Sequence, residues 1–273
     1  MIQVLREIFS YPFLVRAAAA GFLVSLCAAL LGVSLVLRRY SMIGDGLSHA
    51  GFGALAIASA AHAAPLAVAI PLVSLAAVFL LRLSETSKVR GDAAVALLST
   101  GSLALGVMVV SVASGVNTDV NSYLFGSILA VRQSDVWLSA ALGAAVLALF
   151  ALCYHQIFAV TFDETFAKAT GVKTGSYTMI TAVLTALTIV LGMRMMGALL
   201  ISSLIIFPAL TSMRVCKSFK SVTICAVCVS SACFFSGLVI SFLWATPAGA
   251  SVVVVNMLFF AVFSAAGAII DNR

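Results

Sequence analysis

Charged side chains are scarce in this sequence. Of 273 residues, 15 are lysine or arginine and 9 are aspartate or glutamate, so only 9% are charged. An ordinary soluble domain has roughly a quarter. So few charges cannot cover the surface of a soluble protein this long. Disordered chains are poor in apolar residues, and the 63% hydrophobic content excludes that class as well. The remaining class is a polytopic membrane protein, in which a net charge of +6 does not indicate a nucleic-acid partner.

Several chemical motifs are also missing. No glycine is followed by lysine, which excludes a P-loop for ATP, and the HExxH pattern of zinc proteases does not occur. Cys225 and Cys228 form a single CxxC, which would suit a redox pair or a metal site. Without a second CxxC or a βαβ pattern, we interpret the two cysteines as packing residues of a lipid-buried helix.

Long apolar runs predict an all-α membrane bundle of eight or nine transmembrane helices, which form a single transmembrane domain over residues 1–273. A span needs about 20 apolar residues. The predicted spans are 17–37, 43–61, 65–82, 93–118, 136–154, 174–193 and 195–213, with two more in 221–270, which divides at 246–249. The total falls to eight if the segments flanking Arg194 are one broken helix.

Two further segments are apolar without being spans. Residues 1–13 are expected at the membrane interface, with Tyr11 and Phe13 as anchors. Residues 120–131 are too short to cross and fit a re-entrant or interfacial segment.

The basic residues predict an orientation, since lysine and arginine concentrate in cytoplasmic loops. If residues 38–42 are cytoplasmic, most basic residues lie on that side, so the N-terminus is expected outside and the C-terminus inside. The residues on the cytoplasmic side are then Arg38, Arg39, Arg82, Lys88, Arg90, Lys168, Lys173, Arg214, Lys217, Lys220 and Arg273.

Asp45 and His49 are the first candidates for chemistry. They lie four residues apart at the start of the second predicted span and share one face of a helix. A carboxylate and an imidazole together suit zinc, manganese or ferrous iron. The alternative is that Asp45 is only the helix N-cap and His49 contacts it. A helix that starts near Met42 places His49 about a third of the way into the membrane.

A stripe of small residues accompanies this pair. Gly46, Ala50, Ala54 and Ala58 repeat every four residues, which lets another helix approach closely.

Two later segments carry weaker signals. Residues 162–172 predict a short amphipathic helix that ends at Gly171, either as a docking element or as a solvated loop. In 196–210, Pro208 predicts a kink and Ser202 and Ser203 place polar groups in a span, which suits a pathway lining or ordinary packing.

The remaining polar candidates are weaker still. His62 and His155 are expected in loops, Asn117, Asp119 and Asn121 meet an incoming ion or form a wet loop, and Asn256 is expected to bond to a neighbouring helix.

Six segments in order resemble the permease subunits of ABC importers for zinc, manganese and iron. They cover most of the chain, and the 37–56 segment is the most diagnostic. The six are YPFLVRA (11–17), LRRYSMIGDGLSHAGFGALA (37–56), SYLFGSILAV (122–131), FDETFAKATGV (162–172), ALTIVLGMRMMGALLISSLIIFPAL (186–210) and TPAGASVV (246–253).

The resemblance implies a transport subunit in a cell membrane, with no enzymatic activity of its own. It implies two copies of the permease, two cytosolic ATPase subunits that hydrolyse ATP, and an extracellular metal-binding protein. The metal is cargo and not a resident cofactor. In the family the Asp and His of the second segment serve metal passage, which here are Asp45 and His49. The late segments look more like zinc permeases than manganese ones, so zinc is expected first.

The resemblance also gives the 162–172 segment a role. It looks like the family's coupling helix, which inserts into the ATPase. The residues expected in this contact are Phe162, Asp163, Glu164, Phe166, Ala167 and Gly171. The rival hypotheses are an ATP-independent secondary metal transporter and a membrane scaffold. The scarcity of intramembrane carboxylates argues against the former, and the scaffold leaves Asp45 and His49 unexplained.

Overall fold

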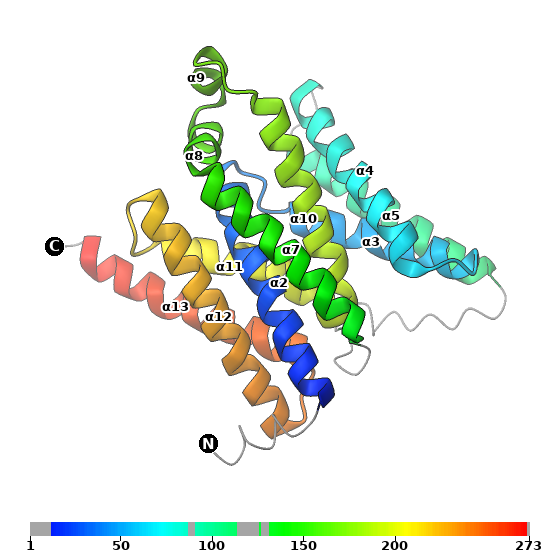
Figure 1. Ribbon diagram of the computed structural model, residues 1–273. Coiled ribbons are helices and arrows are strands. Elements are labelled where there is room, and N and C mark those ends of the chain that lie inside the picture. Colours follow the sequence, from blue (N-terminus) through cyan, green and yellow to red (C-terminus); the bar gives the residue numbers. More distant parts are fainter. Residues whose placement is uncertain (1–11, 87–90, 114–125, 127–130, 272–273) are drawn as a thin grey trace.

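The computed structural model describes residues 12–86, 91–113, 126 and 131–271, and every regular element within them is a helix (Figure 1). The helices are α2 (Pro12–Leu37), α3 (Ile43–Ala60), α4 (Pro65–Thr86), α5 (Gly91–Val112), α7 (Gln133–Leu152), α8 (Tyr154–Phe162), α9 (Glu164–Ala169), α10 (Thr174–Met196), α11 (Ala198–Met213), α12 (Phe219–Trp244) and α13 (Ala248–Asp271).

The all-helical class is confirmed, but the predicted number of spans is wrong. Within the described residues, seven helices are long and apolar enough to cross a membrane: α2, α4, α5, α7, α10, α12 and α13. The predicted spans 43–61 and 195–213 are the helices α3 and α11, but neither is both long enough and apolar enough to be counted as a span. At 16 residues, α11 is about 24 Å long, which is short of the roughly 30 Å hydrocarbon core. The polar residues and glycines of α3 lower its hydropathy.

The segments around Arg194 are two helices and not one broken span. Arg194 lies in the last turn of α10, and the chain bends at Gly197, whose φ of 91° and ψ of 158° favour glycine. Beyond the bend, the start of α11 packs against the end of α10. The contact is close, since a Cβ on Gly192 would lie 2.6 Å from the Ile201 side chain.

Helix α2 is the centre of the bundle, with α7, α10, α11 and α12 packed around it. Over the most apolar 18-residue stretch of each helix, 72% of the residues of α2 are buried but only 17% of those of α5. The backbones of α2 and α11 approach closely where Gly32 meets the Ile205 carbonyl, so that any side chain at position 32 would overlap it.

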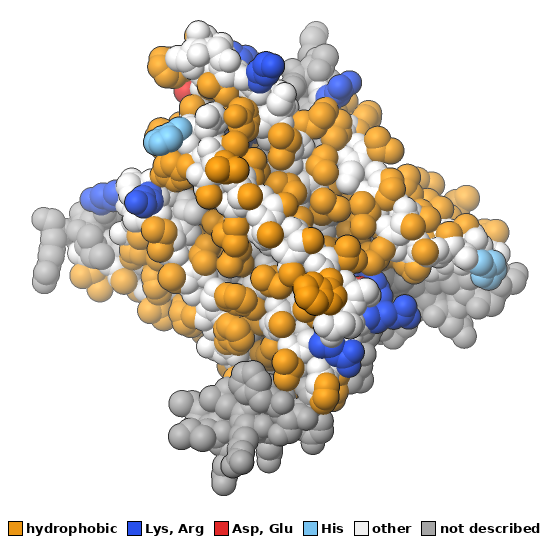
Figure 2. All heavy atoms as spheres, in the orientation of Figure 1, with side chains coloured by type: hydrophobic (Ala, Val, Ile, Leu, Met, Phe, Trp, Pro, Cys, Tyr) orange, Lys and Arg blue, Asp and Glu red, His pale blue; other side chains and the backbone are white. Residues whose placement is uncertain are grey.

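The outer surface of the bundle is apolar. Exposed leucine, methionine and phenylalanine side chains such as Leu105, Met108 and Phe79 line α4 and α5. In Figure 2 hydrophobic side chains cover the middle of the visible face, and lysine and arginine side chains lie towards its margins. This distribution fits a surface that meets lipid or other helices rather than water.

Helix α10 defines two ends of the molecule. At its start, Arg38 donates hydrogen bonds to Thr178 of α10 and to Glu164 of α9, both at 3.0 Å; we call this the Arg38 end. Near the other terminus of α10, Arg194 pairs with Asp135 of α7; we call this the Arg194 end. At 1.5 Å per residue, Thr178 and Arg194 are about 24 Å apart along the helix.

Other sequence predictions have mixed outcomes. The division of 221–270 is confirmed, since α12 ends at Trp244, Ala245 takes a left-handed conformation, and α13 begins at Ala248. The start of the first span needs correction, because α2 already begins at Pro12 and includes Phe13, whereas the interfacial position expected for residues 1–13 stays a prediction and residues 1–11 lie outside the described residues. Tyr11, Asn117, Asp119, Asn121 and nearly all of 120–131 lie outside the described residues. The orientation of the termini stays a prediction.

Candidate functional site

Helix α3 carries the candidate metal ligands and is enclosed by other helices on most of its surface. Its glycines allow this close packing. A Cβ on Gly46 would lie 2.8 Å from Val95 of α5, and one on Gly53 would lie 2.8 Å from the Ser102 carbonyl oxygen of the same helix. The predicted stripe of small residues is buried as expected. All four members (Gly46, Ala50, Ala54 and Ala58) are among the buried residues of α3.

Asp45 and His49 lie together at the edge of α3 that remains open. Asp45 Oδ2 and His49 Nε2 are 3.7 Å apart, which is too long for a hydrogen bond. Two ligands of one tetrahedral zinc, each about 2.1 Å from the ion, are about 3.4 Å apart. The pair is therefore spaced to bind one cation with little rearrangement.

The N-cap alternative for Asp45 is wrong. The N-cap of α3 is Met42, and Asp45 is the third residue of the first turn. At that position a carboxylate is favoured by the positive N-terminal end of the helix dipole and keeps both oxygens available for another partner.

Contacts with α10 and α11 locate the Asp45–His49 pair among the other helices. Gly44 lies beside Ser202 and Ile205 in the first half of α11, and Gly51 lies beside Met193, close to the end of α10. Asp45 and His49 therefore lie between the level where α11 meets α2 and the level of the end of α10. The expectation that His49 lies about a third of the way into the membrane stays a prediction.

The Asp45–His49 pair is accessible from the surface, and it supplies only two metal ligands. The side chain of Asp45 is 44% exposed and that of His49 is 23% exposed. Among the described residues, no group of three or more His, Cys, Asp or Glu side chains could hold a metal ion. Two protein ligands with water in the other positions would make a weak site, as transient passage of an ion requires.

Ser202, Ser203 and Pro208 lie on α11, and Ser202 is beside Gly44 of α3. Pro208 lies inside the helix and is buried. The hydroxyls of Ser202 and Ser203 are buried, and neither has a hydrogen-bond partner among the described residues. Buried hydroxyls without partners are uncommon and leave acceptors available for water or an ion. Their use in a pathway stays a prediction, supported by the contact of Ser202 with Gly44.

The 162–172 segment forms the short helix that its sequence predicts. Asp163 caps α9 by accepting a hydrogen bond from the Phe166 backbone N–H at 2.9 Å. Gly171 follows the C-cap with a φ of 85°, which is the usual glycine stop. Ala167 is buried, whereas Phe162 is 58% and Phe166 63% exposed. An apolar surface is therefore left open at the Arg38 end, where helix α8 leads into α9.

Glu164 ties this short helix to the bundle. Its carboxylate accepts from Lys168 at 2.8 Å and from Arg38 at 3.0 Å, and it lies 3.4 Å from the Thr174 hydroxyl. The hydrogen bond from Lys168, with the positive charge of Arg38, lowers the pKa of Glu164, although burial partly opposes this. The carboxylate is therefore a fixed anion at neutral pH, and it orients α9 against α2 and α10.

Asp135 and Arg194 form an ion pair that the sequence patterns do not predict. Arg194 Nη1 donates to Asp135 Oδ1 at 3.0 Å, and the other carboxylate oxygen accepts from the Arg132 backbone N–H at 2.9 Å. Asp135 is almost completely buried. Arg194 is the single charge between Lys173 and Arg214, and that isolation was the available signal. Its partner is 59 residues away and could not be identified without the fold.

The remaining candidates form no further site among the described residues. His62 is exposed in the α3–α4 turn, and His155 lies in α8 against Tyr154. Asn256 donates to Val252 of its own helix, so the expected interhelical bond is not formed by that group. All six cysteines are free, and Cys228 is exposed on α12.

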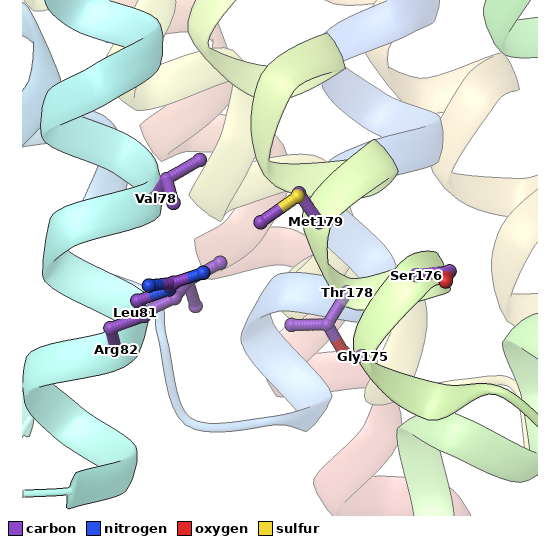
Figure 3. Close-up of a pocket in the computed structure, with 7 residues that line it drawn as sticks. All are labelled: Val78, Leu81, Arg82, Gly175, Ser176, Thr178 and Met179. Carbon is purple, nitrogen blue, oxygen red and sulfur yellow. The ribbon is translucent and has the colours of Figure 1, made fainter.

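A cavity of about 380 Å³ lies elsewhere, between α4 and α10. Arg82 of α4 and Met179 of α10 extend into it (Figure 3). Thr178, which accepts from Arg38, also lines it, so the cavity belongs to the Arg38 end and not to the candidate metal site.

Seven span-length helices, together with a short helix α3 that packs mainly against α4 and α5 and carries an aspartate–histidine pair, define a polytopic membrane protein with a candidate cation site. The model of the ABC 3 transport family matches residues 10–267, and the chain belongs to this family. The resemblance inferred from the six sequence segments is thereby confirmed.

Known proteins are similar to this chain over nearly its whole length. The manganese import system permease protein ScaB of Streptococcus gordonii is 30% identical over 263 residues, which cover 96% of this chain and 94% of that protein. The high-affinity zinc uptake system membrane protein ZnuB of Haemophilus influenzae is 30% identical over 250 residues, or 92% and 96% of the two chains. The solved structure of PsaBC from Streptococcus pneumoniae in complex with Fab has a TM-score of 0.84 at 30% identity, covering 96% of this chain and 95% of that one.

Proposed function

We propose that this chain is the transmembrane permease subunit of an ATP-driven importer that moves a divalent transition metal into the cytoplasm. Asp45 and His49 are the residues that contact the metal as it passes. The observation that carries the proposal is the 3.7 Å separation of a carboxylate oxygen and an imidazole nitrogen on the open edge of an otherwise buried helix. Membership of the ABC 3 transport family supports the transport class.

The partners follow from the family and from the Arg38 end. Two copies of the permease would assemble with two cytosolic ATPase subunits, and an extracellular binding protein would deliver the metal. The exposed phenylalanines of the α8–α9 corner, Phe162 and Phe166, offer an apolar contact for the ATPase. Glu164 holds that corner on α2 and α10, so a movement of the ATPase would be transmitted to the bundle. This assignment places the cytoplasm at the Arg38 end.

Zinc is the first candidate for the cargo and manganese the second. The sequence of the late segments favours zinc, whereas ScaB and ZnuB, named for manganese and for zinc, are equally similar at 30% identity. Aspartate and histidine bind both ions, so ligand chemistry does not choose between them.

The test is uptake of labelled zinc and labelled manganese, side by side, in cells that carry the chain with its ATPase and binding protein. Asp45→Ala and His49→Ala are each expected to abolish uptake while the complex still assembles, because each removes one of two protein ligands. His62→Asn is the matched control: it removes an exposed imidazole elsewhere and keeps a residue type that tolerates the positive φ of 50° at that position.

Normal uptake in both site variants would discard the metal site. An inactive ATPase partner gives the second arm of the experiment. Uptake that persists without ATP hydrolysis but collapses with the proton gradient would instead identify an ATP-independent secondary transporter.

A further inference from the structure

The bend between α10 and α11 contacts α3 on both sides of the metal pair. We call residues 192–205 the elbow. Met193, on the α10 side, lies against Gly51, where a Cβ would be 2.6 Å from its methyl group. On the α11 side, a Cβ on Gly44 would lie 3.1 Å from Ile205 Cδ1 and 3.6 Å from Ser202 Cα. Gly44 immediately precedes Asp45 and Gly51 follows His49 by two residues, so the elbow brackets the turn of α3 that carries both ligands.

The elbow is itself fixed to the rest of the bundle beside Met193. The next residue, Arg194, donates to Asp135 at 3.0 Å. Asp135 has one oxygen on the backbone N–H of Arg132, at the start of α7, and the other on Arg194. A carboxylate held at both oxygens has little rotational freedom, so it sets the distance between the start of α7 and the end of α10.

The opposite side of the elbow is held by backbone contact. Gly126, with a φ of 73°, lies against Met196 and Gly197 so closely that a Cβ there would overlap the Met196 backbone. Gly197 supplies the bend through a backbone conformation that other residues rarely adopt. The elbow is therefore tightly located, and the Arg194–Asp135 ion pair is the charged contact that ties it to α7.

We propose that Asp135 and Arg194 are positioning residues for metal passage. Their ion pair fixes the elbow, and the elbow, through Met193 and Ser202, fixes the α3 turn that presents Asp45 and His49. Neither residue contacts the metal. This inference rests on the proposed function, and it makes the pair a remote support of the metal ligands.

The first test measures the geometry of α3 without metal. His49→Cys is introduced after the six native cysteines are replaced by alanine, and its rate of reaction with a charged thiol reagent is measured. Asp135→Asn and Arg194→Met are each expected to change this rate at least a few-fold. The double variant should change it no more than either single variant, because one interaction is lost in all three. Arg194→Lys, which keeps the charge, should restore part of the original rate.

The second test measures transport in the protein with its native cysteines. In Asp135→Asn and Arg194→Met, the metal concentration for half-maximal uptake should rise by about tenfold, as is typical when a support of a metal ligand is lost, after correction for the amount of protein in the membrane. Arg214→Met is the matched control in both tests, because Arg214 is an exposed arginine that lies over Phe260 at the far end of α11.

An unchanged labelling rate at position 49 in both ion-pair variants would overturn the positioning role. So would a fall in the amount of protein with no change in the half-maximal concentration, because that is the effect of a purely structural pair. Failure of the proposed function is read separately, as normal uptake in Asp45→Ala and His49→Ala.

Discussion

The two ends of α10 are each held by an arginine and an acidic residue, but in different surroundings. At the Arg38 end both side chains are partly accessible, 14% for Arg38 and 29% for Glu164. At the Arg194 end the Asp135 side chain is 2% exposed, and Arg194 alone, at 24%, reaches the surface. The two ion pairs have the same N···O distance, 3.0 Å, but they differ in how readily water can replace a lost partner.

The ends also differ in the number of partners. Glu164 is shared by Arg38, Lys168 and Thr174, so removal of one leaves two. Asp135 has Arg194 as its ion-pair partner and one backbone N–H. The Arg38 end is thus built to tolerate disturbance, which suits a surface that receives force from another subunit. The Arg194 end depends on one contact, which suits a fixed reference point.

Arg194→Met should give the largest effect. It leaves a buried carboxylate without its cation, and breaking a buried pair costs about 3–5 kcal/mol. We expect a large fall in the thermal unfolding temperature of the purified protein in detergent. Arg38→Met is the comparison, and its fall should be clearly smaller because Lys168 continues to neutralise Glu164. Equal falls would remove the distinction between the two ends.

Gly197→Ala and Gly171→Ala extend the comparison to the backbone. Gly197 combines a φ of 91° with a ψ of 158°, a region that is almost exclusive to glycine, so alanine there should cost about 1–3 kcal/mol. Gly171 has a φ of 85°, but a Cβ there would meet nothing within 4 Å, so we expect a loss near the lower limit, about 1 kcal/mol. Thermal unfolding of the two variants measures the difference; a greater loss at Gly171 would contradict it.

The smallest effect is expected for Glu164→Gln, about 1 kcal/mol or less, because the pair is partly accessible. The pKa of Glu164 is lowered in the folded protein, so its stabilising contribution is present above the ordinary value of 4.5 and is lost as the pH falls through the lower folded value. The difference in unfolding temperature between wild type and Glu164→Gln should therefore be constant near neutral pH and vanish in acid. A difference that grows as the pH falls would show that the sign is wrong.

Local rules predicted much of the fold. The stop at Gly171, the breaks at 62–65 and 246–249, and the close packing of the Gly46–Ala58 stripe all follow from residue types and spacing over a few positions. The predicted number of spans is too high because it counts α3, whose polar residues and glycines lower its hydropathy, and α11, which the bend at Gly197 shortens to 16 residues.

The candidate site divides in the same way. The aspartate–histidine pair could be predicted because both residues lie on one helical face four positions apart. The position of the pair among the other helices could not be predicted, because it depends on the contacts of Gly44 with α11 and of Gly51 with α10. The Asp135–Arg194 pair joins helices that are distant in sequence, so only the fold could show it.

The glycines of α3 limit where new side chains can arise on this helix. A larger residue at Gly53 would meet the backbone of α5, and one at Gly44 or Gly46 would meet neighbouring side chains within 3.1 Å. New ligands cannot readily arise at those positions, and the open edge is where substitutions fit. If Asp45 and His49 contact the metal as proposed, a change of metal would act through positions 45 and 49, or through residues of neighbouring helices that face them, rather than through the glycines of α3.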